Sequence, residues 1–176
     1  SLYTNLKKLE SWVESEKNLV NKAILHSLLA REYLDYMRHN RRQLSDRTAL
    51  DVDEAPADIR EWSTNLFVAK VDEHNLASLK DSVRLLEVSS KEYVPFVELE
   101  DGSRFYGHDM YHLLAARAVD TYQLLDGFQV DTLQRARINS VYINMINAYR
   151  HRVGAEDAVV LATLDYWKWK STGGGI

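Results

Sequence analysis

The residues whose types and spacing suit a defined chemistry are His108 and His112. They stand four positions apart, so in a helix their imidazole rings lie one turn apart on the same face. Two imidazoles at this spacing can ligate one divalent transition metal, although they fill only half of a closed four-ligand shell. Further donors for such a shell are Asp109, Glu98, His74 and His151. The alternative is a structural pair, with His108 capping a helix start and His112 packed beside a hairpin.

No other pattern typical of catalysis is present in the sequence. There is no cysteine, which excludes thiolate catalysis, disulfides and cysteine-based metal sites. The glycine-rich phosphate loops, the G-x-S-x-G nucleophile turn and the HExxH zinc motif are missing as well. The sequence therefore favours a protein that is not an enzyme and has no cofactor. Carboxylate pairs that assemble from distant residues leave no signal of this kind, so acid–base catalysis stays open.

Three aromatic residues near the C-terminus, Tyr166, Trp167 and Trp169, are candidates for binding a protein partner. Residues two positions apart point about 200° apart on a helix, so Trp167 and Trp169 cannot both enter one core. We expect one of them at the surface beside lysine side chains, where tryptophan is a natural interface anchor. The alternative is that it packs back on the N-terminal helix under those lysine stems.

Arginines gather in two places and define a third hypothesis, nucleic-acid binding. One group ends the N-terminal helical region and the other lies at the two ends of a helix over 131–152; together they are Arg38, Arg41, Arg42, Arg135, Arg150 and Arg152. Basic residues in a last helical turn also offset the helix dipole, which is the simpler explanation. The net charge of −4 argues in the same direction, because a basic footprint is the first requirement for nucleic-acid binding.

The elements that position these residues are helices. Only 7 glycines and 2 prolines occur among 176 residues, and a chain so poor in helix breakers favours long helices. Residues 1–43 are predicted to form a long N-terminal helical arm, because apolar side chains recur every three or four positions from Leu6 to Met37. The polar run 14–18 predicts a break into a short and a long helix, and the long one is a candidate for homodimer formation.

Residues 44–170 are expected to form a helical domain with an inserted β-hairpin, and 171–176 a flexible tail. The hairpin is predicted at about 93–107, where Asp101-Gly102 separates two short apolar runs. A helix is predicted from Pro56 through about Val71, although 67–71 also have strand-like composition and are an alternative third strand, and 72–75 are interpreted as a turn. The predicted fold class is mainly α, a bundle of five or six helices with this one hairpin.

One segment resembles a known family. Val94-Pro95, an apolar strand, the Asp101-Gly102 turn and a following helix resemble the later part of the thioredoxin-like domain of glutaredoxins and glutathione transferases. The resemblance covers about 66–118 and implies a sheet in which a cis-proline lies beside a thiol site. The redox cysteines of that family are missing here, so no residue's role is carried over.

These observations order three hypotheses. The first is a non-enzymatic helical protein–protein interaction or assembly module, which binds a protein partner or a second copy of itself. The alternatives are a metal-binding helical bundle enzyme that uses His108 and His112, and a nucleic-acid-binding regulator that uses the arginine clusters. No apolar run approaches the roughly 20 residues that span a bilayer, so no membrane partner is expected and a cytoplasmic location is the default.

Overall fold

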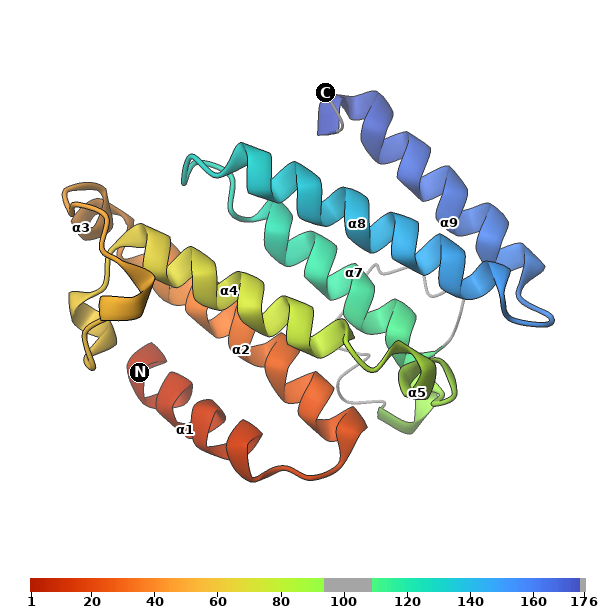
Figure 1. The fold of residues 1–176 in the computed structure, drawn as a ribbon, viewed down its shortest axis with the longest axis horizontal. Helices are drawn as coiled ribbons and strands as arrows, with labels where there is room; N and C mark the ends of the chain where they lie inside the picture. The colour runs from red at the N-terminus through yellow and green to blue at the C-terminus, as the bar shows by residue number, and fades with distance from the viewer. Residues whose placement is uncertain (94–108, 175–176) are drawn as a thin grey trace. The chain divides into compact units, whose positions relative to one another are not determined.

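The computed structural model describes residues 1–93 and 109–174 of the chain, and the described residues are mainly helical, as predicted (Figure 1). The α-helices are α1 (Leu2–Ser15), α2 (Leu19–His39), α3 (Arg41–Ser45), α4 (Thr64–Leu79), α5 (Ser82–Leu86), α7 (Met110–Gln123), α8 (Asp131–Arg150) and α9 (Glu156–Trp169). Short helical turns are η1 (Val52–Glu54), η2 (Ile59–Glu61), η3 (Ser90–Tyr93) and η4 (Lys170–Gly174). The chain forms two compact units, Ser1–Lys80 and Asp81–Ile176.

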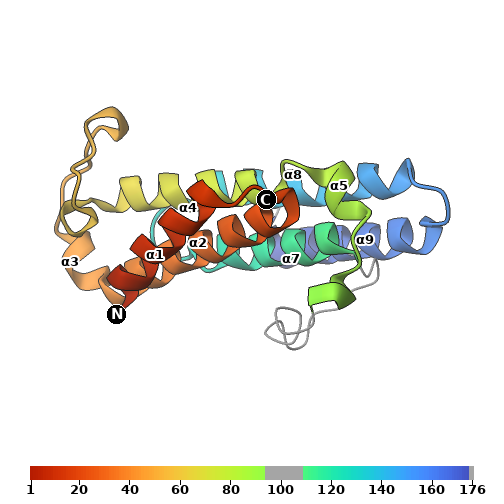
Figure 2. The same cartoon turned by 90° about the horizontal axis from the view of Figure 1, so that it is seen from below.

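The first unit is built from α1, α2 and α4, with α2 packed against both of the others. The predicted break in the N-terminal arm is confirmed, because α1 ends at Ser15 and α2 begins at Leu19. Asn18 caps α2, and its side-chain oxygen accepts a hydrogen bond from the backbone N–H of Asn21. The chain therefore reverses over three residues, and α1 and α2 lie side by side in Figures 1 and 2. Eight residues of α2 are buried, from Val20 to Met37.

An aromatic cluster closes one end of the first unit. Trp62 and Phe67 pack with the rings of Tyr33 and Tyr36, with centroid separations of 5.3 to 6.4 Å. The connection between α3 and α4 is held by its own hydrogen bonds, since the indole N–H of Trp62 donates to the carbonyl of Pro56 at 2.7 Å. This packing fixes where α4 begins and therefore the register of α4 against α2.

The second unit is built from α7, α8 and α9, with α7 and α9 each packed against α8. Asp109 caps α7 by accepting the backbone N–H of His112 at 2.8 Å, and it also accepts the hydroxyl of Tyr149 from α8 at 2.7 Å. At the other end of α7 the buried amide of Gln134 donates to the carbonyl oxygens of Tyr122 and Gln123. Polar caps at both ends thus hold α7 against α8.

The predicted fold class is corrected, because the β-hairpin expected at about 93–107 finds no support in the described residues. The described residues contain no β-strand; their one β-type pairing is an isolated antiparallel bridge between Ser89 and Asp109. Tyr93, where the first strand was expected to begin, lies in the helical turn η3. That turn forms because Ser89 accepts from two following N–H groups, those of Lys91 and Glu92, which curls the chain. Residues 94–108 lie outside the described residues.

The alternative of a third strand over 67–71 and the predicted turn over 72–75 are both wrong, whereas the predicted helix through about Val71 is confirmed from Thr64 onward. Residues 67–71 are helical, and the predicted turn over 72–75 lies inside α4, which is continuous from Thr64 to Leu79. Phe67, Val71 and Ser78 are buried at helical spacing, so packing against α2 overrides the strand-like composition. The described part of 66–118 is therefore helical and does not form the sheet of a thioredoxin-like domain.

Within residues 1–93 and 109–174, no helix combines the length and the apolarity that crossing a bilayer requires.

Candidate functional site

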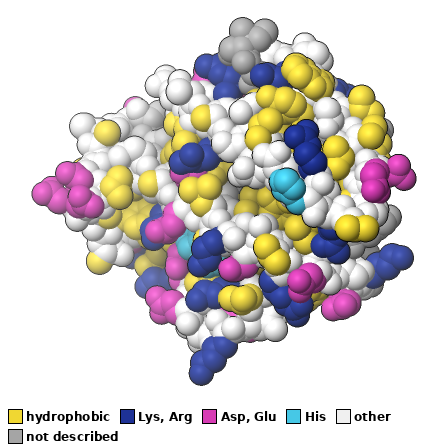
Figure 3. Space-filling model, turned by 45° about the vertical axis from the view of Figure 1, so that its right-hand side comes forward, with side chains coloured by type: hydrophobic (Ala, Val, Ile, Leu, Met, Phe, Trp, Pro, Cys, Tyr) yellow, Lys and Arg dark blue, Asp and Glu magenta, His cyan; other side chains and the backbone are white. Residues whose placement is uncertain are grey.

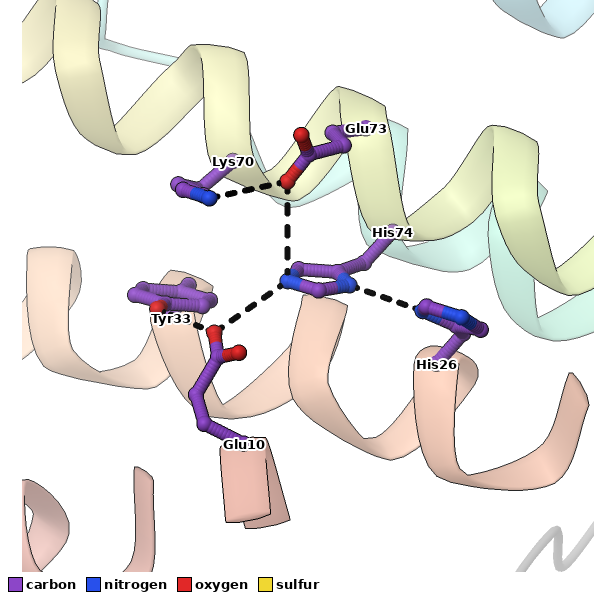
Figure 4. Close-up of polar contacts among 6 residues, drawn as sticks. All are labelled: Glu10, His26, Tyr33, Lys70, Glu73 and His74. Carbon is purple, nitrogen blue, oxygen red and sulfur yellow. Dashed lines mark hydrogen bonds and ion pairs between the residues drawn. The ribbon is translucent and has the colours of Figure 1, made fainter. Parts of the chain in front are cut away.

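A polar cluster in the interior of the first unit joins its three long helices. Glu10 comes from α1, His26 and Tyr33 come from α2, and His74 comes from α4 (Figure 4). His74 is almost completely buried, with 4% of its surface exposed, and its ring stacks on Tyr33 at a centroid distance of 5.6 Å. Each of these three long helices therefore contributes a titratable side chain to one contact network.

The two histidines are hydrogen-bonded directly to each other. The Nδ1 atoms of His26 and His74 are 2.9 Å apart, so one of them must carry a hydrogen and the other a free lone pair. The other ring nitrogen of His74, Nε2, lies 3.3 Å from the Glu10 carboxylate, at an angle that makes it a charge contact rather than an aligned hydrogen bond. In neutral His74 the one ring hydrogen is favoured on Nε2, because it then faces the Glu10 carboxylate. Nδ1 keeps its lone pair and accepts a hydrogen bond from His26.

Tyr33 completes the network on the carboxylate side. Its hydroxyl donates to the same Glu10 oxygen at 2.5 Å. Burial, together with this hydrogen bond to a carboxylate, raises the pKa of Tyr33 well above its ordinary value, so the phenol stays neutral and acts as a donor. Figure 4 shows the resulting order, in which Glu10 lies between Tyr33 and His74, and His74 lies between Glu10 and His26.

The electrostatics of the cluster keep the carboxylate charged and one imidazole neutral. Contact with His74 lowers the pKa of Glu10, and this effect and the Tyr33 hydroxyl outweigh the opposing effect of burial. Burial, followed by the nearby charges of His74 and Lys22, lowers the pKa of His26 from 6.5 to about 4. His26 is therefore neutral at neutral pH and supplies a hydrogen-bonding group instead of a charge.

The outer side of the network is formed by an exposed ion pair on α4. The ammonium group of Lys70 lies 3.0 Å from the Glu73 carboxylate, and the same carboxylate oxygen lies 3.8 Å from Nε2 of His74. Both partners are solvent-exposed, so this pair contributes little to stability by itself. Its effect is to place a second carboxylate near His74, beside Glu10.

The arrangement can hold one hydrogen between the two imidazoles and keeps a carboxylate in charge contact with His74. Nδ1 and Nε2 of His74 face different partners, and the described residues contain no group of three His, Asp or Glu side chains placed to hold a metal ion. We name Glu10, His74 and His26 the relay.

A second candidate site lies on α9, in the other unit. Trp167 is 59% exposed, whereas Trp169 is 9% exposed and packs on the ring of Tyr142 at 5.8 Å, so the predicted division between the two tryptophans is confirmed. Three further exposed apolar side chains, Val160, Leu161 and Leu164, share the face of Trp167. Apolar side chains gather toward the upper right of Figure 3, the side on which α9 lies. We name these four exposed residues the α9 stripe.

The other predicted site residues are placed as follows. Tyr166 is buried and donates its hydroxyl to Asn139 at 2.7 Å, which fixes α9 on α8. His112 is buried in α7, and the position of its predicted partner, His108, lies outside the described residues. The metal prediction for this histidine pair accordingly stays a prediction.

The six predicted arginines are all exposed, and three of them belong to each unit. Those of the second unit are dispersed. Arg135 and Arg150 lie 15 positions apart on α8, which corresponds to about 22 Å along the helix axis. Arg38, Arg41 and Arg42 follow closely on one another where α2 ends and α3 begins, in the first unit. No single surface formed by all six follows from this placement, and nucleic-acid binding stays a prediction.

The fold and these two sites define the class of the protein: a two-unit, mainly helical chain with a partly buried histidine relay and an exposed apolar helix face. Comparison with protein-family models, with curated proteins and with solved structures gives no match in any of the three.

Proposed function

We propose that the protein is a helical interaction module that associates with a second copy of itself through α9. The observation that carries this proposal is the α9 stripe, four large apolar side chains exposed on one face over about two turns of helix. A contiguous apolar face of this kind on a folded unit is typical of a protein-binding surface. Within the stripe Trp167 is the expected anchor, because buried tryptophans contribute most to many interfaces.

Charge complementarity favours a second copy as the partner. The stripe has acidic residues at its N-terminal end, Glu156 and Asp157, and the exposed Lys168 at its C-terminal end. Two copies of α9 crossing in opposite directions about Leu164 place the acidic end of each helix within a turn of the basic end of the other. A parallel pairing would instead bring like charges together and align the two helix dipoles unfavourably. We therefore expect an antiparallel, two-fold symmetric contact.

The size of the surface sets the expected affinity. α9 has 14 residues, so the paired helices are about 21 Å long. A contact between two helices of this length is at the low end of specific interfaces, which corresponds to a dissociation constant on the order of 10–100 μM. The association is expected to be reversible and dependent on concentration.

The test is analytical ultracentrifugation over a concentration range from about 5 to about 500 μM. We expect the wild-type mass to rise from 20.4 kDa towards twice that value, because two apolar stripes are removed from water in the dimer. The variant L164E should stay monomeric, since it places two carboxylates at the centre of the contact. The control V153E, at a fully exposed position in the turn before α9, should behave like the wild type. A wild type that remains monomeric at the highest concentration would contradict the proposal.

A charge-reversal pair tests the antiparallel arrangement. K168E should weaken association several-fold, because it faces the acidic end of the second copy. Combining K168E with E156K and D157K should restore association, since the two ends are then complementary again. If the triple variant associates no better than K168E alone, the copies do not pair antiparallel through α9.

A further inference from the structure

We propose that the relay in the first unit is a proton-sensitive latch. It holds α1, α2 and α4 together while Glu10, His74 and His26 carry no added proton or one, and it releases them when a second proton is added. The proposal concerns the first unit only and is independent of the association through α9.

The hydrogen bond between the histidines sets the number of protons that the relay accepts. With no added proton, His26 donates from Nδ1 to the free Nδ1 lone pair of His74. With one added proton the bond is kept, because one Nδ1 atom still carries a hydrogen and the other still accepts it, and the added charge lies near the Glu10 carboxylate. With two, both Nδ1 atoms carry hydrogens and face each other across 2.9 Å, so the bond is replaced by repulsion between two cations.

The surroundings of the relay oppose the second proton. The charged and titratable groups around His26 and His74 on the three helices and just after α4 are Glu10 of α1, Lys22 and Tyr33 of α2, Lys70, Glu73 and His74 of α4, and Lys80. Glu10 is the carboxylate nearest to the histidine pair and balances one imidazolium, whereas the second carboxylate near His74, that of Glu73, is already paired with Lys70. Lys22 and Lys80 act on His26 in the same direction as a charged His74. The second positive charge is therefore unbalanced in a half-buried place.

The latch links three helices because each relay member belongs to a different one. Loss of the bond between His26 and His74 separates α2 from α4, the pair of helices that packs most extensively in this unit. Since Glu10 reaches His74 across α2, the contact from α1 is weakened at the same time. The expected result of acidification is local opening of the first unit while the second unit, which lacks the relay, stays closed.

The sign and the size follow from the protonation of His26. A histidine whose folded-state pKa lies below its value in an unfolded chain, about 6.5, stabilises the fold above pH 6.5. This stability is lost progressively as the pH falls from 6.5 towards about 4. Between pH 7 and pH 5 the opening equilibrium rises on the order of tenfold, after allowance for the partial exposure of His26.

Hydrogen exchange measured by mass spectrometry on the full chain tests the latch at pH 7 and pH 5, with intrinsic exchange rates corrected for pH. Peptides from α1 and α4 should show the tenfold rise in opening in the wild type, whereas H26Q, which keeps a hydrogen-bonding side chain but cannot be protonated, should show less than a threefold rise. H39Q removes an exposed histidine from the end of the same helix and is the matched control, so it should retain the wild-type response. An equal rise in H26Q, or no rise in the wild type, would overturn the proposal.

A measurement on the wild type alone guards against failure of H26Q to fold. Imidazole nitrogen NMR spectra recorded during a pH titration should show that the His26 ring is neutral at pH 6 and shares its Nδ1 hydrogen with His74. A His26 ring that is already protonated at pH 6 in the folded protein would contradict the proposal, whatever the exchange data show.

Discussion

The two tryptophans of α9 give the sharpest test of how this helix is used. Trp167 and Trp169 belong to the same helix and differ by two positions, yet one is exposed and the other is buried. We expect W169A to lower the free energy of unfolding while association through α9 is retained. We expect W167A to abolish association with little change in stability. The two substitutions remove the same atoms, so the difference between them reports only the surroundings.

The expected loss in W169A follows from its packing. Trp169 lies against the rings of Tyr142 and Tyr166, at centroid distances of 5.8 and 6.1 Å. Replacing a buried tryptophan by alanine costs about 3–5 kcal/mol, and a position in the last turn of a helix belongs at the lower end, about 3 kcal/mol. For a unit of this size the loss corresponds to a fall of more than about 10 °C in Tm. For exposed Trp167 the expected loss is below about 0.5 kcal/mol.

The assay separates stability from association by concentration. Urea unfolding is followed by far-ultraviolet circular dichroism at about 5 μM, where a dimer with the expected affinity is mostly dissociated. Association is followed by ultracentrifugation at about 500 μM. Circular dichroism is preferred over fluorescence because each variant removes one of the four tryptophans.

Two results would refute this reasoning. A loss of stability in W167A as large as that in W169A would mean that Trp167 is covered by a part of the protein. Equal and negligible effects of both variants on stability and on association would mean that this face of α9 is neither core nor interface.

Three further predictions concern single hydrogen-bonded groups. Y149F should lower the free energy of unfolding by about 1.5 kcal/mol in a urea titration, because the buried Asp109 carboxylate loses a donor at 2.7 Å. Q134A should lower the free energy of unfolding by about 2 kcal/mol in the same assay, because the buried Gln134 amide donates to the last carbonyls of α7. Q134E should not recover this stability, since a carboxylate has no hydrogen to donate. Because its pKa is lowered in the fold, Glu10 stabilises the protein above pH 4.5 and this contribution is lost at lower pH. E10Q should therefore be less stable than the wild type at pH 7 by about 1 kcal/mol, after allowance for solvent screening, and the difference should shrink as the pH falls below 4.5.

The N-terminal helices and the split between the tryptophans were predictable from the sequence, because both depend on helical periodicity alone. Apolar residues recur at steps of three and four up to Met37, and the capping residue Asn18 marks the start of α2. Likewise the angle between Trp167 and Trp169 follows from their separation by two positions, whatever the rest of the fold does. Features of this kind need no knowledge of which segments meet.

The relay was not predictable, because its members come from positions 10, 26 and 74. No motif connects residues at such separations, and only the packing of α1, α2 and α4 brings them together. The sequence directed attention to His108 and His112 instead, since four-residue spacing is visible without a fold. Spacing along the chain detects ligands on one helix and misses contacts among several helices.

A signal for His74 was nevertheless present in the sequence and was misinterpreted. The run Asp72-Glu73-His74-Asn75 resembles a turn by composition, yet Phe67, Val71, His74 and Ser78 continue one helical face at steps of four, three and four. That face is interrupted only if His74 is counted as polar. A histidine in register with buried residues on both sides is more simply interpreted as buried, and a buried histidine requires a hydrogen-bonding partner. On α2, His26 lies in a comparable position between Ala23 and Ala30, which are buried on the same helix. Two helices that each carry a histidine in their apolar stretch are candidates to pack with those histidines in contact, but that α2 and α4 are the two that meet is set by the packing and not by the sequence pattern.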